Sequence, residues 1–264
     1  MTLPVSVVIV SHNKPRLVKE AIASVLAQTL PDWEAVLMDS GVLLRQGFFD
    51  DLKDPRVRIM PTNETPDMAR SRNMASWCFN EAINRGLLHG ELYLYLCDDD
   101  LYYPEAFRIF WEYYFGHQRE PQAMYASLDI GFLNAAGKTR YVGRRYADRP
   151  AGRFCGGRGL NYEVDYLQFC HTARILERYR AAYNNQEYFS ENRQHATNAD
   201  GLFMEQIGAL TKIWPVDRVV GMNRRAPDSI NYPASTYTLL RSLAHYKLGA
   251  LKHYYYVYRQ KRLG

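Results

Sequence analysis

The 264-residue sequence is 47% apolar and 23% charged, as in a globular protein that can bury its own core without a disulfide or metal staple. The formal net charge is +5, but residues 229–264 hold six basic and no acidic side chains, which leaves the first 228 residues at about −1. Nucleic-acid-binding proteins usually spread basic charge over their binding face, and this segregation argues against that class.

Strands and helices are predicted to alternate along the first 115 residues. A continuous β-branched run at 5–11 is typical of a strand buried on both faces, and apolar residues at helical spacing follow Asn13 and Pro15, which suit a helix start. We predict strands at 5–11, 33–39, 57–60 and 92–97, and helices at 15–28, at 67–87 and from Pro104. This order indicates an α/β fold with a mainly parallel sheet.

The second half of the chain reads differently. It begins with a predicted hairpin, 124–133 with 139–142, followed by a Gly- and Arg-rich loop at 149–159. Further predicted elements are a strand near 163–169, a helix near 171–182, a polar loop at 184–197, a helix at 200–210 and a strand at 213–220.

Three adjacent carboxylates, Asp98-Asp99-Asp100, end one of the predicted buried strands. Carboxylates this close disfavour each other's charged form, a conflict that a hard divalent cation removes. A solvated acidic turn that caps the helix at Pro104 is the alternative. Asp39 ends a neighbouring predicted strand and would lie on the same rim, which favours a ligand site there.

Two common phosphate-binding motifs do not occur in the sequence. The first strand is followed by Ser11-His12-Asn13-Lys14 in place of G-x-G-x-x-G, and no G-x-x-x-x-G-K-[ST] is found. A phosphate-bearing ligand would therefore be held by side chains and a metal ion.

Four segments in order carry a resemblance to a known family. They are Val-Ser-Val-Val-Ile-Val-Ser-His-Asn at 5–13, the helix at 20–29 with the strand to Asp39, Ala-Arg-Ser-Arg-Asn at 69–73, and the strand that ends in the Asp triplet. Together they resemble a family-2 glycosyltransferase over roughly residues 3–110, with the triplet as its DXD metal motif. Beyond that point, only Asn-Ala-Asp-Gly-Leu-Phe at 198–203 is similar to the family.

The resemblance implies a GT-A fold, with a mixed, mainly parallel sheet flanked by helices. One catalytic domain would span 1–228, with a Rossmann-like nucleotide-sugar-binding half at 1–115 and an acceptor half at 116–228. The implied reaction is an inverting, metal-dependent transfer from a nucleotide-diphosphate sugar, with a UDP-sugar expected. The acceptor would be a saccharide or a lipid-linked molecule, in polysaccharide or glycoconjugate synthesis at the cell surface, and Mn²⁺ or Mg²⁺ would be the cofactor.

The same resemblance assigns roles to residues. It places nucleotide-sugar contacts at Ser11, His12, Asn13, Asp39, Arg72, Asp98 and Asp99, and metal contacts at Asp99 and Asp100. His12 stands where an aromatic residue is common, a position suited to stacking on the base. Ser40 and Val42 depart from the family pattern after Asp39, which leaves the base undetermined.

The catalytic base is expected to be a carboxylate that takes the proton of the acceptor hydroxyl. Asp200 matches the family's acidic residue, follows a polar loop and begins a predicted helix. Capping of that helix is the structural alternative for Asp200, and Glu205 and Glu191 are the other candidate bases.

Histidine and arginine side chains give weaker signals. His171, His195 and His245 have no spacing that selects one as a metal ligand. Arg144 and Arg145, and Arg153 in the next loop, are expected in solvated loops, with contact to the diphosphate or the acceptor as the alternative.

The C-terminal segment, 229–264, is predicted to form a basic, Tyr-rich helical extension, with helix over 235–262. It would pack on the domain or a second subunit, as in a homodimer, or contact anionic lipid head groups. No CxxC pair, signal peptide or spanning segment is evident, so we expect a cytoplasmic protein, with peripheral contact at the inner membrane face as one option.

Two other functions remain open from the sequence. One is a nucleotidyltransferase on a related fold, which the missing Gly-rich loop after the first strand disfavours. The other is a non-catalytic module that binds nucleotide sugars or a surface.

Overall fold

The computed structural model describes residues 3–62, 68, 71–134, 136–148, 151, 164–226 and 243–254. The strands are β1 (Leu3–Ser11), β2 (Trp33–Asp39), β3 (Val57–Pro61), β4 (Gly90–Cys97), β5 (Leu101–Tyr102), β6 (Ala123–Leu133), β7 (Thr139–Arg145), β8 (Phe169–Thr172) and β9 (Ile213–Arg225). The α-helices with assigned bounds are α1 (Pro15–Leu26), α3 (Met74–Asn84), α4 (Ala106–Gly116), α5 (Ala173–Tyr183) and α6 (Ala199–Leu210). A further helix covers residues 243–254.

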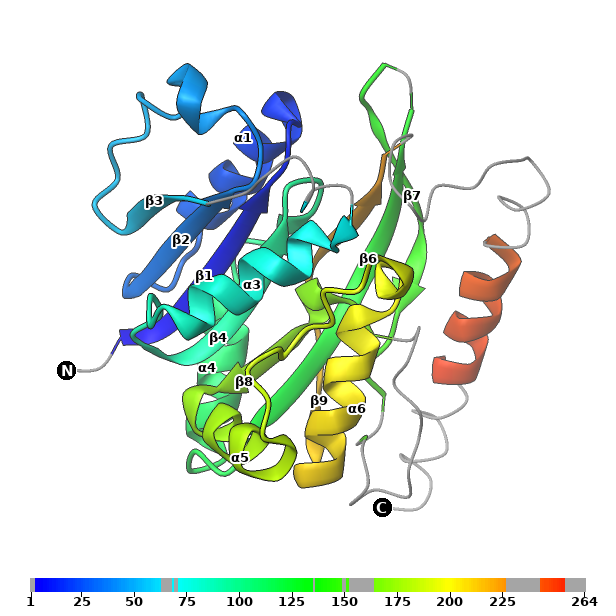
Figure 1. Cartoon of the computed structure of the whole chain (residues 1–264). Coiled ribbons are helices and arrows are strands. Elements are labelled where there is room, and N and C mark those ends of the chain that lie inside the picture. Colours follow the sequence, from blue (N-terminus) through cyan, green and yellow to red (C-terminus); the bar gives the residue numbers. More distant parts are fainter. Residues whose placement is uncertain are drawn as a thin grey trace.

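All of these strands form one sheet in the order β3-β2-β1-β4-β8-β6-β9-β5, with β7 paired to β6 (Figure 1). Strands β1 to β4 pair with one another in parallel, and β6 runs parallel to β9. Strand β8 is antiparallel to both β4 and β6, and β5 to β9. The predicted mixed, mainly parallel α/β fold is confirmed, and the two halves of the chain share one sheet.

Helices cover both faces of the sheet. Along β1, Val7 and Ile9 join the cluster with α1 and α4, and Val8 and Val10 join the cluster with α3, α5 and α6. This is why the strand needs apolar residues on both faces. Burying each such side chain contributes about 1.5–3 kcal/mol, so the two clusters fix the positions of the strand ends.

Several predicted boundaries in the first half are corrected. Helix α1 begins at Pro15 as expected, but the residue before it, Lys14, makes no side-chain cap. Asn13 instead has φ 56°, and its Oδ1 accepts a hydrogen bond of 3.0 Å from the Val42 amide. A Cβ on Gly41 would lie 2.3 Å from that oxygen, so this loop requires a glycine. The helix predicted from Pro104 begins at Ala106, after the short strand β5.

Two predicted elements in the second half are wrong in position. The strand expected near 163–169 is at Phe169–Thr172, because Asp165 and Gln168 form a capping box that turns the chain into a 3₁₀ turn, Tyr166–Gln168. Strand β9 continues to Arg225, five residues past its predicted end, since its polar last residues pair with β6.

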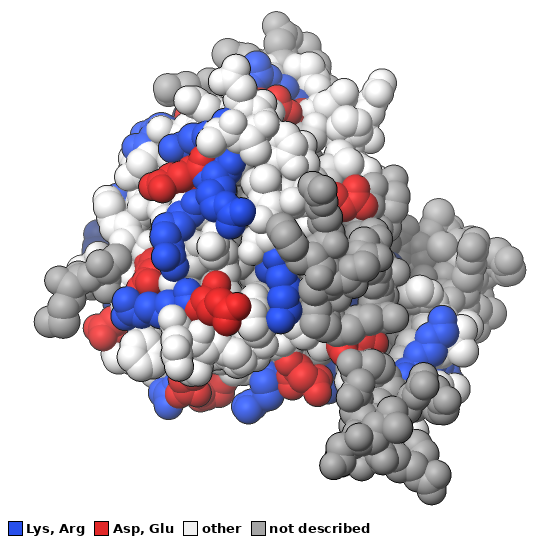
Figure 2. All heavy atoms as spheres, turned by 90° about the horizontal axis from the view of Figure 1, so that it is seen from below, with Lys and Arg blue, Asp and Glu red and all other residues white. Residues whose placement is uncertain are grey.

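No helix in the described ranges has both the length and the apolarity to cross a bilayer. On the face seen in Figure 2, basic and acidic side chains are interspersed, and neither the basic nor the acidic side chains cover that face continuously. Of the predicted C-terminal helix, 235–262, only the part at 243–254 falls within the described residues.

His171 on β8 is a buried structural histidine, as its missing ligand spacing suggested. It is fully buried, its Nδ1 lies 3.0 Å from the Thr172 carbonyl and its Nε2 lies 2.7 Å from the Tyr95 hydroxyl. A carbonyl only accepts, so Nδ1 carries the proton and Nε2 accepts from Tyr95. Burial lowers the pKa of His171 to about 4, against an ordinary 6.5.

We expect the protein to lose stability as the pH falls from about 6.5 through about 4, because the unfolded chain binds a proton that the folded chain excludes. The contribution of His171 to this loss should total about 3 kcal/mol. Urea unfolding at a series of pH values measures it as the difference between the wild type and His171→Phe. Parallel pH dependence in the two proteins would contradict the assignment.

Candidate functional site

A cavity of about 540 Å³ opens at the carboxyl ends of β1 and β4, where parallel α/β sheets commonly bind ligands. Its lining comes from both halves of the chain. The polar lining residues are His12, Asn13, Lys14, Ser40, Asn73, Asp98, Asp99, Asp100, Asp165, Tyr166, Thr197, Asp200, Asn223, Arg224 and Arg225. The cavity thus brings the predicted base and the Asp triplet together, although 100 residues separate them in the sequence.

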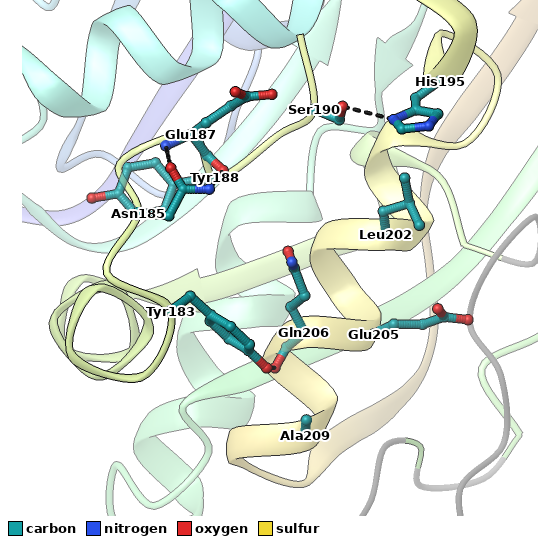
Figure 3. Close-up of a pocket in the computed structure, with 10 residues that line it drawn as sticks. All are labelled: Tyr183, Asn185, Glu187, Tyr188, Ser190, His195, Leu202, Glu205, Gln206 and Ala209. Atoms are coloured by element: carbon teal, nitrogen blue, oxygen red, sulfur yellow. Dashed lines mark hydrogen bonds between the residues drawn. The ribbon is translucent and has the colours of Figure 1, made fainter. Parts of the chain in front are cut away.

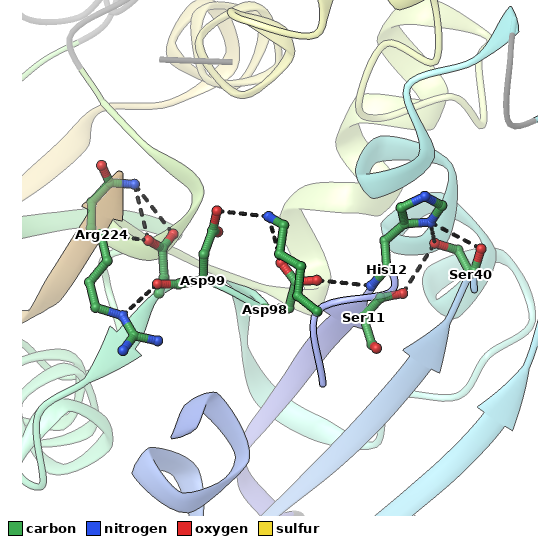
Figure 4. A network of polar contacts seen from close by, with 9 residues as sticks. Ser11, His12, Ser40, Asp98, Asp99 and Arg224 are labelled. Atoms are coloured by element: carbon green, nitrogen blue, oxygen red, sulfur yellow. Dashed lines mark hydrogen bonds and ion pairs between the residues drawn. The ribbon is translucent and has the colours of Figure 1, made fainter. Parts of the chain in front are cut away.

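The segment after β1 forms one wall of the cavity (Figure 4). The His12 amide donates to Asp98 Oδ2 at 2.9 Å, which links the end of β1 to the end of β4. His12 Nδ1 lies 3.0 Å from Ser40 Oγ, and that hydroxyl is also within 3.2 Å of the Ser11 carbonyl. If the Ser40 proton goes to the carbonyl, His12 Nδ1 is the donor to Ser40. The imidazole is therefore held in place with its ring at the cavity.

Three residues assigned to the nucleotide sugar do not line the cavity directly. Ser11 is fully buried and contributes its main chain to the Ser40 contacts. Asp39 is 4% exposed, with Oδ2 accepting from the Leu44 amide at 2.9 Å and Oδ1 without a hydrogen-bond partner among the described residues. Arg72 pairs with Glu191 at 2.7 Å, so its guanidinium is directed to the loop before α6.

Lys14 forms ion pairs with two carboxylates of the Asp triplet. Its Nζ lies 3.2 Å from Asp98 Oδ1 and 2.9 Å from Asp99 Oδ2. Burial lowers the pKa of Lys14, but the two carboxylates outweigh it and hold the pKa above its ordinary value. Burial also raises the pKa of Asp98 to about 6, even with Lys14 beside it. None of this was anticipated from the sequence, because the lysine meets the triplet only when β1 and β4 pair.

Asp100 faces the other way, toward the end of β9. It is 2% exposed and accepts hydrogen bonds from the Arg224 amide at 2.9 Å and from Asn223 Nδ2 at 3.2 Å. Asn223 also donates to Asp165 at 3.2 Å. Burial, with Asp99 and Asp165 nearby, raises the pKa of Asp100 well above its ordinary value. The structural alternative, in which the triplet caps the helix after Pro104, is wrong, since Glu105 holds that position.

Asp165 lines the cavity and was not singled out in the sequence. Arg145, which was expected in a solvated loop, forms an ion pair with it. Asp165 reaches the site through the 3₁₀ turn, and Arg145 Nη1 lies 3.8 Å from its Oδ2. Burial raises the pKa of Asp165, and Arg145 opposes that shift. The expectation of a solvated Arg144-Arg145 pair is corrected, because Arg144 is bound at 2.7 Å to the buried Asp129. Arg153 lies outside the described residues.

Asp200 lies in the first turn of α6, while Asn198 takes the N-cap position. Its Oδ1 accepts from the Gly201 amide at 2.8 Å. Burial, with Asp165 nearby, raises the pKa of Asp200 to about 7. A carboxylate with this pKa exchanges a proton readily near neutral pH, as a general base requires. Asn198, and not Asp200, therefore holds the cap position of α6, and the role of Asp200 as base stays a prediction.

The two other candidate bases lie elsewhere. Glu205 lines a second cavity of about 440 Å³ between α6 and the loop after α5, together with His195 and Tyr183 (Figure 3). Glu191 is engaged by Arg72 and by Asn80. His195 is bound to Ser190 at 2.8 Å, and His245 is exposed on the last described helix. Neither His195 nor His245 lines the cavity that holds the Asp triplet.

The donor chemistry at the triplet fits Mg²⁺ or Mn²⁺. Asp99 and Asp100 supply hard carboxylate oxygens, and the raised pKa of Asp100 reflects burial and repulsion that a divalent cation would relieve. Within the described ranges, no three His, Cys, Asp or Glu side chains already converge on one point. That arrangement is usual for Mg²⁺, which is bound by one or two carboxylates together with substrate phosphates.

Comparison with known proteins shows which family the first half of the chain resembles. Residues 6–115 match the model of glycosyl transferase family 2. Protein CgeD of Bacillus subtilis (strain 168) is 26% identical over 229 residues, which are 85% of this chain and 51% of CgeD. The chain thus spans about half the length of this curated relative.

Two solved structures show the same fold. S. aureus TarS 1-349 in complex with UDP-GlcNAc superposes with a TM-score of 0.63 at 14% identity, over 92% of this chain and 66% of TarS. The mannosyltransferase PcManGT of Pyrobaculum calidifontis, in complex with GDP-Man and Mn²⁺, gives 0.55 at 14% identity, over 96% and 65% of the two chains. The match confirms the resemblance to glycosyltransferase family 2 over residues 6–115, and the superpositions confirm the GT-A fold.

Proposed function

We propose that this protein is an inverting, metal-dependent glycosyltransferase that moves a sugar from a nucleotide-diphosphate donor, with a UDP-sugar expected, to an acceptor hydroxyl. A saccharide or lipid-linked acceptor fits a role in polysaccharide or glycoconjugate synthesis. The observation that carries the proposal is one cavity that holds both Asp200, with a pKa of about 7, and the Asp98-Asp99-Asp100 triplet.

The chemistry follows from where these groups lie. Asp200 takes the proton from the acceptor hydroxyl as its oxygen bonds to the anomeric carbon, and the bond from that carbon to the diphosphate oxygen breaks on the opposite face. The products are the glycosylated acceptor and the nucleoside diphosphate. A divalent cation held by Asp99 and Asp100 supplies Lewis-acid neutralisation of the diphosphate charge when it is bound.

The nucleotide is assigned to the end of β1. His12, whose ring is fixed by Ser40, is placed to stack on the base, and Asp98 is expected to face the ribose. The partnerless Oδ1 of Asp39 is an acceptor suited to a base or ribose donor. The donors bound by TarS, UDP-GlcNAc, and by PcManGT, GDP-Man, support a nucleotide-sugar ligand and leave the base of this chain open.

The test is a thermal-shift screen of UDP, GDP and dTDP and their sugars, with and without Mn²⁺. A bound nucleotide at about 100 times its Kd should add about 2.7 kcal/mol of stability by mass action. The expected result is stabilisation by one nucleotide that is larger with Mn²⁺, followed by hydrolysis of its sugar donor. No stabilisation by any of these nucleotides would overturn the proposal.

The same protein sample distinguishes the alternatives. A nucleotidyltransferase would release pyrophosphate from a nucleoside triphosphate and a sugar phosphate. A non-catalytic module would bind the nucleotide sugar with no turnover, and Asp200→Asn would then change nothing measurable.

A further inference from the structure

The helix at 243–254 packs against β7, with Tyr246 as its buried side chain. In Figure 1 this helix lies beside β7, separate from the helices that cover the sheet. Tyr246 is 5% exposed, while Leu251 and Tyr254 of the same helix are 66% and 73% exposed. Leu243, one turn before Tyr246, is partly buried against the same core cluster. The helix therefore has one face on the domain and one in solvent.

Close contacts fix Tyr246 against β7. A Cβ on Gly143 would lie 2.4 Å from the Tyr246 Cβ, so the strand has room for this tyrosine only because residue 143 is glycine. Two helical turns after Tyr246, the ring of His253 stacks on the ring of Tyr146, with the centroids 4.0 Å apart and the ring planes at an angle of 12°. The helix thus contacts β7 at Gly143 and the chain just after β7 at Tyr146.

The Tyr246 hydroxyl binds an arginine of β9. Arg225 Nη2 donates a hydrogen bond of 2.9 Å to it. Arg225 lines the cavity that holds Asp200. Arg225 and Arg145 both lower the pKa of Asp165, which lines the same cavity.

The arginines at the end of β9 retain unused donors. Arg225 Nε and Arg224 Nη2 are buried and have no hydrogen-bond partner among the described residues, although both side chains line the cavity. A buried donor left unpaired is costly, and a negatively charged oxygen is the partner that a guanidinium binds most strongly. This wall of the cavity therefore has the chemistry to bind an anion, beside the carboxylates of the triplet.

We propose that Tyr246 is a positioning residue for the donor site: it holds Arg225 at the cavity so that this arginine binds the diphosphate of the nucleotide sugar. The C-terminal helix is then a component of the donor site. This inference rests on the proposed function and extends it to a segment outside the matched family domain.

The experiment compares a nucleoside diphosphate with its nucleoside. The probe is whichever of UDP, GDP or dTDP stabilises the wild type most with Mn²⁺, and its nucleoside is measured as a competitor of that diphosphate. Arg225→Gln should lower the affinity for the diphosphate by about tenfold, the scale of one lost charge-assisted hydrogen bond. Tyr246→Phe, which keeps the packed ring, should lower this affinity by at least about threefold.

Nucleoside affinity should stay within about twofold of the wild type in both variants, because a nucleoside has no phosphate for Arg225 to bind. Leu251→Ser, at an exposed position of the same helix, is the matched control and should match the wild type with both probes. Unchanged diphosphate affinity, or an equal loss for the nucleoside, would overturn the inference. Failure of every nucleotide to bind the wild type would instead overturn the proposed function.

Discussion

Replacing Asp200 by Asn is expected to reduce turnover by at least ~10²-fold, the usual scale for removing a general base, while donor binding stays near the wild-type value. The amide keeps the size of the side chain and an oxygen that can accept from the Gly201 amide. It cannot take a proton from the acceptor. Steady-state turnover and nucleotide affinity from the thermal shift separate the two effects.

The pH dependence gives a second readout for Asp200. Only the ionised carboxylate accepts a proton, so wild-type turnover should fall as the pH drops through about 7, where burial has set the pKa of Asp200. The residual activity of Asp200→Asn should lack this step. Glu205→Gln is the control on the same helix, since Glu205 faces the second cavity. If Glu205→Gln loses the activity and Asp200→Asn keeps it, the base is misassigned.

Replacing Asp100 by Asn is expected to abolish the stabilisation that Mn²⁺ adds to nucleotide binding and to lower turnover by ~10²-fold or more, because a metal ion supplies several kcal/mol of charge stabilisation. The fold itself should not suffer. The amide oxygen can still accept from the Arg224 amide, as Asp100 does at 2.9 Å. Burial and the neighbouring carboxylates raise the pKa of Asp100, so its charge opposes folding at neutral pH.

The thermal midpoint of Asp100→Asn without metal should therefore equal or exceed that of the wild type. Asp51→Asn, an identical change at an exposed residue, serves as the control for general effects of charge. Mn²⁺ binding is followed by electron paramagnetic resonance in the presence of the nucleotide. Wild-type Mn²⁺ affinity in Asp100→Asn would remove this residue from the metal assignment.

Local patterns were sufficient to predict the order of the main strands and helices in the first half of the fold, although the helix predicted at 67–87 is Met74–Asn84 and β5 was missed. The β-branched run of β1 and the spacing of Leu17, Val18, Ala21 and Ile22 on α1 depend on which faces are buried, and burial on a strand or helix has a fixed period. The second half was predicted with errors of several residues. Strand β8 is four residues long, and the end of β9 is polar and forms a strand only because β6 pairs with it.

The candidate site, too, was predictable from the sequence only in part. The sequence by itself determined the Asp98-Asp99-Asp100 triplet at a strand end and the acidic residue at α6, because a strand end and a helix start are local features. Tertiary structure alone decided which groups surround them. Lys14 reaches the triplet through the pairing of β1 with β4, and Asp165 through a 3₁₀ turn.

The charge distribution shows the difference most clearly. The sequence placed the basic excess in residues 229–264 and left open what that segment contacts. In the described part of this segment, the buried side chain that contacts the domain is an uncharged tyrosine, Tyr246, whose hydroxyl binds Arg225 of β9. Composition and periodicity depend only on the order of residues along the chain. A hydrogen bond between residues 21 positions apart also depends on how a helix packs on a strand.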